Sequence, residues 1–93
     1  MTKLDRRNYN LQRLYGINLK QYTQMLKDQN GVCKICGGTN KGKTLHVDHN
    51  HKTKRVRGLL CFRCNRGVGY LERFFKDTTI MTNAVEYLYG DRV

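Results

Sequence analysis

The segment from His46 to His51 combines side chains that can move protons and bind hard metal ions. It holds all three histidines of the chain together with Asp48. Histidine acts as a base near neutral pH because its unperturbed pKa lies close to that range. Carboxylate oxygen is the ligand type that Mg²⁺ and Mn²⁺ prefer. The adjacent Asp48 and His49 therefore predict a hard-metal ligand and a general base side by side.

A further ligand for such a site follows the last cysteine. Asn65 comes directly after Cys64, and its amide oxygen can also bind a hard metal. These groups suit phosphodiester hydrolysis, in which a histidine takes a proton from water and a divalent metal stabilises charge on the departing oxygen. The alternatives are an N-cap role for Asn65 and an exposed polar hairpin for the Asp48 and His49 pair.

Four cysteines form two Cys-x-x-Cys pairs, Cys33 with Cys36 and Cys61 with Cys64. Two residues between thiolates let a tight turn present both sulfurs to one tetrahedral ion, and two such knuckles complete a structural zinc site. Two disulfides would need an oxidising compartment, and nothing in this sequence directs export. A thioredoxin-like redox pair accounts for one Cys-x-x-Cys and not for two. We therefore predict one structural zinc.

The chain is short, with 93 residues, no tryptophan and 39% hydrophobic residues. One small core is expected, and such a core rarely supplies more than about 3–5 kcal/mol, so a bound metal is a common addition. No stretch approaches the roughly 20 apolar residues of a transmembrane helix, and no signal-peptide pattern is present. We expect a soluble, cytoplasmic protein that does not bind membranes.

A net charge of +11 favours a polyanionic partner. Nucleic acid is preferred over an anionic membrane surface, because membrane binding usually uses one basic amphipathic helix and the basic residues here are spread over turns. Four of them flank the candidate site and are expected to hold phosphates of DNA: Lys52, Lys54, Arg55 and Arg57. A solvated surface is the alternative for this cluster.

Two short helices are predicted before the first knuckle. Residues 4–15 carry spaced apolar positions among charges, and Gly16 ends the run. Asn18 is a good N-cap for a second helix, in which apolar residues recur on one face until Asn30 and Gly31.

A hairpin is predicted between the two knuckles. Residues 44–48 alternate with period two, which indicates a half-buried strand, and residues 55–59 form its return strand. Leu45 and Val47 share the buried face of the first strand. His46 and Asp48 share the other face.

Two helices should follow, one from the second knuckle and one capped by Asp77 or Thr78. Four residues of the last helix are expected to face inward: Ile80, Ala84, Tyr87 and Leu88. Phe74, Phe75 and the tyrosines are interpreted as core residues in preference to base-stacking platforms. The expected order is helix, helix, knuckle, hairpin, knuckle, helix, helix.

Several segments resemble the phage recombination endonuclease VII family, within the HNH (ββα-metal, His-Me finger) nucleases. They are Tyr15-Gly16-Ile17, residues 31–37 with the first knuckle, residues 47–51, and residues 56–65 with the second knuckle. The likeness runs in order from about Tyr15 to Gly67 and continues more weakly to Leu88.

The resemblance implies a small α+β fold with a zinc-stapled ββα-metal (HNH) core. Residues 1–93 would form a single HNH endonuclease domain, with N-terminal helices in 1–31, the core in 32–76 and a C-terminal helix in 77–93. The best-known family member acts on branched DNA as a dimer, and a monomer and a homodimer both stay open here. If the chain is phage-encoded, its cytoplasm would be that of the host cell.

The resemblance also implies roles for single residues. The four cysteines match the zinc ligands, Asp48 matches the carboxylate of the catalytic metal, and Asn65 matches its partner ligand. His49 matches the general base. His51 matches a second histidine that contacts the scissile phosphate or the metal, and zinc ligation or simple exposure are its alternatives. His46 is left outside the catalytic set, with orientation of Asp48, contact with DNA, packing and solvation all open.

Together these inferences predict a metal-dependent DNA endonuclease that leaves 5′-phosphate and 3′-hydroxyl ends, with nicking and branched-DNA cleavage both open. Its cofactors would be a structural Zn²⁺ and a catalytic Mg²⁺ or Mn²⁺. A non-catalytic zinc-knuckle nucleic-acid-binding module and an RNA-binding protein are the other classes. The set of Asp48, His49 and Asn65 distinguishes them, because a binding module needs no hard-metal site beside its zinc.

Overall fold

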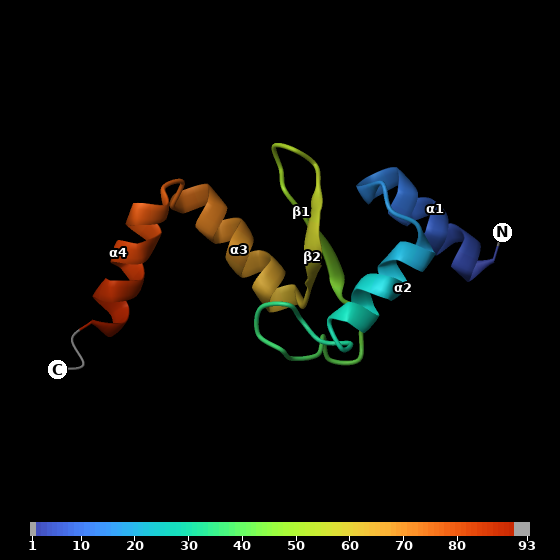
Figure 1. The fold of residues 1–93 in the computed structure, drawn as a ribbon, viewed down its shortest axis with the longest axis horizontal. Helices are drawn as coiled ribbons and strands as arrows, with labels where there is room; N and C mark the ends of the chain where they lie inside the picture. Colours follow the sequence, from blue (N-terminus) through green and yellow to red (C-terminus); the bar gives the residue numbers. More distant parts are fainter. Residues whose placement is uncertain (1, 91–93) are drawn as a thin grey trace.

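The computed structural model describes residues 2–90, which form four helices and one hairpin (Figure 1). In chain order the elements are α1 (Lys3–Tyr15), α2 (Leu19–Asp28), β1 (His46–His49), β2 (Val56–Leu60), α3 (Phe62–Phe74) and α4 (Thr78–Tyr89). The predicted small α+β class and the predicted order of elements are confirmed. Among the described residues, no helix has both the length and the apolar character needed to cross a membrane.

Both N-terminal helices begin with reciprocal side-chain hydrogen bonds. The Thr2 hydroxyl accepts from the Asp5 amide while the Asp5 carboxylate accepts from the Thr2 amide. Asn18 and Gln21 exchange the same pair of bonds at the start of α2. Gly16 ends α1 with a φ of 72°, a left-handed conformation that costs glycine little. The predicted stop at Gly16 and N-cap at Asn18 are therefore confirmed.

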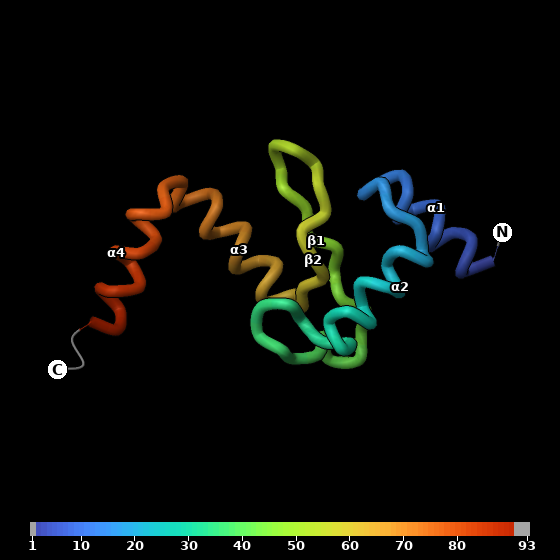
Figure 2. Tube along the Cα trace, viewed as in Figure 1, coloured from blue at the N-terminus to red at the C-terminus, as the bar shows by residue number. Residues whose placement is uncertain are grey.

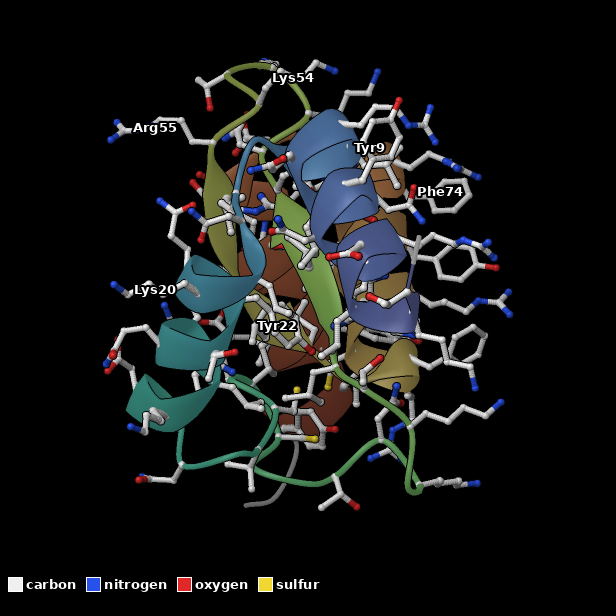
Figure 3. The ribbon with its side chains drawn as sticks, turned by 90° about the vertical axis from the view of Figure 1, so that its right-hand side faces the viewer. Tyr9, Lys20, Tyr22, Lys54, Arg55 and Phe74 are labelled. Atoms are coloured by element: carbon white, nitrogen blue, oxygen red, sulfur yellow. The ribbon has the colours of Figure 1, made fainter. Side chains whose placement is uncertain are left out.

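The core lies where α2 packs against the hairpin. Tyr22 is 4% exposed, and its hydroxyl donates to the Leu45 carbonyl oxygen at 2.8 Å. Figure 3 shows Tyr22 directed into the middle of the molecule. At the end of α2, the Gln29 side chain both donates to the Leu59 carbonyl and accepts from the Leu59 amide, each at 2.9 Å. These bonds attach the N-terminal helices to the hairpin that carries His49.

The two strands pair antiparallel, with His46 opposite Leu60 and Asp48 opposite Gly58. The register shifts between Asp48 and His49, because β2 contains Arg57 as an extra residue at that point. Val47 and the preceding Leu45 are buried, as the alternating pattern predicts. Asp48 is also buried, although the pattern assigns it to the polar face, because an ion pair with β2 covers it.

The last helix differs from its prediction. Asp77 caps α4 as expected, but Ile80, Tyr87 and Leu88 are exposed, Leu88 by 64%. The expectation of an inward-facing α4 is wrong because α4 runs out from the end of α3, away from the hairpin (Figures 1 and 2). The radius of gyration of the Cα atoms is 15.9 Å, whereas a compact domain of this length has about 12 Å.

The assignment of the aromatic residues to the core is correct for Tyr22 and wrong for several others. Tyr70 is 48% exposed and Phe74 is 64% exposed, because this side of α3 faces away from the hairpin. Figure 3 shows Phe74 extending outward from the ribbon. Helical periodicity predicted the helix but not which side of it would be covered.

We predict that Tyr22→Phe destabilises the fold by about 1–2 kcal/mol, because the buried Leu45 carbonyl loses its donor. Burial raises the pKa of the Tyr22 phenol, so the hydroxyl is present as a donor at neutral pH. Urea unfolding of the zinc-loaded protein measures the change. Tyr9→Phe is the matched control, since Tyr9 is exposed and should change stability by less than about 0.5 kcal/mol. Equal stability of Tyr22→Phe and the control would contradict this account of the core.

Candidate metal centre and catalytic site

The four cysteine sulfurs come together at the base of the hairpin. All four Sγ atoms lie within 4.8 Å of one another, and Cys36 Sγ is 3.8 Å from Cys61 Sγ. A tetrahedral zinc with Zn–S bonds of about 2.3 Å separates its sulfurs by about 3.8 Å. The donor set and its spacing therefore suit one structural zinc, and a four-thiolate site needs no histidine.

The backbone of each knuckle directs N–H groups at the sulfurs. The Gly38 amide lies 3.4 Å from Cys36 Sγ, and the Cys64 amide lies 3.5 Å from Cys61 Sγ. Cys61 is also the N-cap of α3, so the ligand that ends the hairpin begins the helix. The N-cap alternative for Asn65 is therefore wrong.

Two of the thiols have shifted pKa values. Burial opposes ionisation of Cys33, but hydrogen bonds from the backbone of Cys36, Cys61 and Ile35 outweigh it and lower the pKa to about 6. Burial and the hydrogen-bonded neighbouring cysteines raise the pKa of Cys64 to about 12. Four crowded thiols ionise together only when a cation balances their charge, which is what a bound zinc provides.

The loop after the first knuckle is fixed to α3, and the knuckle itself packs on β2. The buried Asn40 donates to the Thr44 carbonyl at 2.8 Å, and its side-chain oxygen accepts from the Phe62 amide at 2.9 Å. On β2, a Cβ at Gly58 would lie 2.8 Å from Lys34 Cδ, so the Lys34 side chain of the knuckle lies directly against the strand there. The sequence analysis did not identify Asn40, because a lone asparagine in a loop belongs to no recognisable spacing motif.

Asp48 lies beside the irregular point of the hairpin and is 9% exposed. Its carboxylate accepts two hydrogen bonds from Arg57, from Nε at 2.8 Å and from Nη2 at 3.1 Å. Arg57 Nη2 also donates to Glu72 Oε1 at 2.7 Å. A carboxylate has about four acceptor sites, so the bidentate pair leaves capacity for another partner. Its oxygen chemistry fits a hard divalent cation.

Glu72 joins this charge cluster from α3, and sequence reasoning missed it. The hydrogen bond from Arg57 holds the pKa of the Glu72 carboxyl below its usual range against the opposing effect of burial, and His51 and His49 add to the lowering. Glu72 stands two helical turns after Asn65, so the two residues share one side of α3. That spacing is the signal that could have identified it.

The histidines separate into a pair and a single residue. The ring of the half-buried His49 lies 5.0 Å from the ring of His51 and 5.8 Å from the ring of Tyr15, measured between centroids. His46 is exposed at the opposite end of β1, with its ring 6.3 Å from that of Phe62. The structure therefore brings His49 and His51 together and leaves His46 apart from them.

The hairpin turn that carries His51 is held by Asn50. Its side-chain oxygen accepts from the amides of Lys52 and Thr53 at 2.8 and 3.0 Å. Lys52, Lys54 and Arg55 are exposed around this turn, and Figure 3 shows Lys54 and Arg55 extending from it into solvent. Arg57 differs from these three residues because its guanidinium is paired with two carboxylates.

Asn65 lies in the first turn of α3, and its backbone N–H donates to the Cys61 carbonyl oxygen at 2.9 Å. α3 packs against both strands of the hairpin. By helical spacing Asn65 shares a side of α3 with Glu72, and Glu72 bonds to Arg57 of β2 from that side. A groove of about 620 Å³ lies between the hairpin turn and this helix, with His51, Lys52 and Glu72 in its lining. The lining of this groove thus holds one imidazole, one carboxylate and the three cations Lys52, Arg73 and Lys76.

The family model for recombination endonuclease VII matches residues 8–90. The chain belongs to the recombination endonuclease VII family. This finding confirms the resemblance seen in the motifs.

Curated relatives of this endonuclease VII family member include two phage proteins. The Gene 59 protein of Mycobacterium phage D29 is 42% identical over 76 residues, and the Gene 59 protein of Mycobacterium phage L5 is 46% identical over 79 residues. Each alignment covers 80% of this chain and 44% of the relative. The chain therefore spans less than half the length of the curated relatives it matches.

We predict that this family member holds about one zinc per chain and unfolds when a chelator removes it, because binding of a structural metal is coupled to folding. Elemental analysis measures the zinc, and circular dichroism with a melting curve measures the fold. Ile35→Ala is the matched control, since Ile35 is exposed between two ligands and supplies none. A metal-free chain that kept its full helical signal and melting transition would rule out a structural zinc.

Proposed function

We propose that this chain is a metal-dependent DNA endonuclease of the HNH, or ββα-metal, type. It hydrolyses phosphodiester bonds and leaves 5′-phosphate and 3′-hydroxyl ends, by nicking or by cutting branched DNA. The observation that carries the proposal is the adjacency of Asp48 and His49 on β1, with α3 packed against the same hairpin. Asn65 lies in the first turn of that helix. Membership of the endonuclease VII family supports it.

Asp48 and Asn65 hold the catalytic Mg²⁺ or Mn²⁺ in this proposal. Their oxygens are the donors that such cations prefer, and Asp48 has acceptor sites free of its pair with Arg57. The bound cation supplies charge stabilisation at the phosphate and at the departing oxygen. Arg57 and Glu72 keep the Asp48 carboxylate in one orientation, so the ligand is ordered before the metal arrives.

His49 is the general base and takes the proton of the attacking water, a role worth typically about 10²–10⁴ in rate. Its ring is half-buried beside Tyr15, which restricts its orientation. His51 contacts the scissile phosphate from the hairpin turn, next to His49. Lys52, Lys54 and Arg55 bind neighbouring phosphates, and Arg57 does so where its ion pairs leave a donor free.

The whole chain, 1–93, acts as one nuclease domain in this proposal. Because its curated relatives are phage proteins, we also propose that it acts in the cytoplasm of a host cell.

We predict that His49→Ala lowers plasmid cleavage in Mg²⁺ by about 10² or more, since proton abstraction is lost. Mn²⁺ binding should survive in this variant because its ligands are untouched. Asp48→Asn should weaken Mn²⁺ binding and cleavage together, since the carboxylate charge is lost while the shape is kept. Gel assays measure cleavage, and electron paramagnetic resonance measures free Mn²⁺.

His46→Ala is the matched control, because His46 is exposed on the same strand and lies outside the proposed catalytic set. Zinc content should stay normal in all three variants. Cleavage by His49→Ala at the wild-type rate would overturn the assignment of the base. A wild-type chain that binds DNA but cuts it with neither Mg²⁺ nor Mn²⁺ would indicate the non-catalytic zinc-knuckle module instead. Cleavage of RNA alone would indicate an RNA-directed protein.

A further inference from the structure

A row of exposed aromatic and basic side chains runs along α3. Phe62, Arg66, Tyr70 and Phe74 recur at every fourth residue, so they follow one side of the helix. The Arg66 guanidinium carbon lies 5.4 Å from the Phe62 ring centroid and 5.9 Å from that of Tyr70. The rings of Tyr70 and Phe74 are nearly parallel, at 12° and 6.0 Å. We call these four residues the aromatic ladder.

The three rings of the aromatic ladder are about half exposed or more. Single exposed apolar residues are normal on a protein surface, whereas a contiguous row of large aromatic side chains is typical of a binding site. The core does not use these rings, because α3 packs on the hairpin through its other sides. The aromatic ladder is therefore free to contact another molecule.

The charges around the aromatic ladder are positive. A groove of about 700 Å³ lies beside it, and among the described residues its lining contains no carboxylate and three cations: Lys41, Arg63 and Arg66. Arg73 lines the next hollow along the helix. The hydrogen bond from Arg66 and the charges of Arg66 and Arg73 lower the pKa of the Tyr70 phenol, so this positive potential reaches the ring. Such a surface complements a polyanion.

The hollows along α3 connect the aromatic ladder with the candidate catalytic site. Arg66 and Tyr70 line both the first groove and the next hollow, whereas Gly69 and Arg73 line that hollow and the groove that contains His51. A Cβ at Gly69 would meet nothing within 4 Å, so the path is open there. A chain of nucleotides can follow this path from His51 to Phe62.

We propose that the aromatic ladder binds unpaired nucleotides of the DNA substrate next to the cleavage site. Bases stack on the rings of Tyr70 and Phe74, and phosphates pair with Arg66 and Arg73. The aromatic rings need the exposed faces of unpaired bases, which a continuous duplex hides in its own stack. The proposal rests on the DNA endonuclease function proposed above, and it names the part of the substrate that α3 recognises.

The test compares the wild-type chain with a double variant that carries both Tyr70→Leu and Phe74→Leu. Leucine keeps an apolar side chain and a good helix former, so the aromatic faces are removed together with the Tyr70 hydroxyl, which accepts from Arg66 at 3.2 Å. Fluorescence anisotropy without added Mg²⁺ or Mn²⁺ measures binding to a labelled oligo(dT) strand and to a blunt duplex. Tyr9→Leu is the matched control, because Tyr9 is a similarly exposed tyrosine with Arg13 beside it on α1.

Loss of one base-stacking contact weakens binding by about fivefold or more, so oligo(dT) affinity should fall by at least about 25-fold in the double variant. The duplex affinity of the double variant should stay within about twofold of the wild-type value. The oligo(dT) affinity of the Tyr9→Leu control should do the same. The chain has no tryptophan, so its emission comes from its six tyrosines, one of which is Tyr70 of the aromatic ladder. Oligo(dT) should quench this emission in the wild type and quench it less in the double variant.

Unchanged oligo(dT) affinity in the double variant would overturn the proposal. An equal loss of duplex affinity would also overturn it, since the surface would then not distinguish unpaired bases. A change in sedimentation without a change in oligo(dT) affinity would assign the surface to a second copy of the chain. The single variant Phe74→Leu repeats the test at the most exposed ring if the double variant melts below the wild type.

The binding and cleavage results separate this proposal from the proposed nuclease function. If the wild-type chain cleaves plasmid DNA but oligo(dT) binding does not depend on the two rings, only the proposed role of the aromatic ladder is overturned. Ring-dependent oligo(dT) binding by a chain that cuts no DNA overturns the nuclease function and leaves a nucleic-acid-binding surface.

Discussion

The convergence of four thiolates at the base of the hairpin is the constraint on which the rest of the structure depends. The described residues bury only a small set of apolar side chains, and the molecule is longer than a compact domain of its size. A metal held by both knuckles would fix the end of β2 and the start of α3 to the loop that follows α2. Cys61 belongs to both elements, because it follows β2 directly and caps α3. The first turn of α3, which contains Asn65, is thereby held at a set distance from the hairpin.

A second link joins the hairpin to α3, between the cysteine cluster and the hairpin turn. Arg57 bonds to Asp48 on β1 and to Glu72 on α3, so one guanidinium connects three elements. Arg57 is the extra residue of β2, at the point where the backbone hydrogen bonds between the strands are interrupted. An isolated surface ion pair contributes little to stability, but the bidentate geometry and the burial of Asp48 make this one well ordered. The irregular point of the sheet is thus where the candidate catalytic carboxylate is oriented.

Local signals in the sequence were sufficient for the four-cysteine cluster, the caps and the hairpin. The spacing of Cys33 with Cys36, the polar residue Asn18 and the alternation around Val47 each act over a few neighbouring residues. The direction of α4 was not predictable in this way, because it depends on how α3 ends near Phe75 and on the absence of a core for α4 to cover. Periodicity identifies an apolar side of a helix and does not identify what covers it.

The candidate site shows the same division between local and distant signals. Asp48 and His49 are adjacent in the chain, so their proximity follows from the sequence alone. The contribution of Glu72 depends on α3 packing across the hairpin, and in the sequence only its helical spacing from Asn65 could have identified it. The exposed rings of Tyr70 and Phe74 were assigned to the core, since an apolar residue in a short chain is usually needed there. Their exposure became evident only once α3 was placed against the hairpin.

Paramagnetic broadening by Mn²⁺ in the nuclear magnetic resonance spectrum of the zinc-loaded chain tests the central claim most directly. The claim is that the zinc-held base of α3 and the hairpin together form one hard-metal site. Because broadening falls steeply with distance from the ion, substoichiometric Mn²⁺ should first broaden the signals of Asp48, His49 and Asn65. Signals of α4 residues such as Leu88 should stay sharp. Uniform broadening, or broadening at the hairpin turn with Asn65 unaffected, would contradict the account.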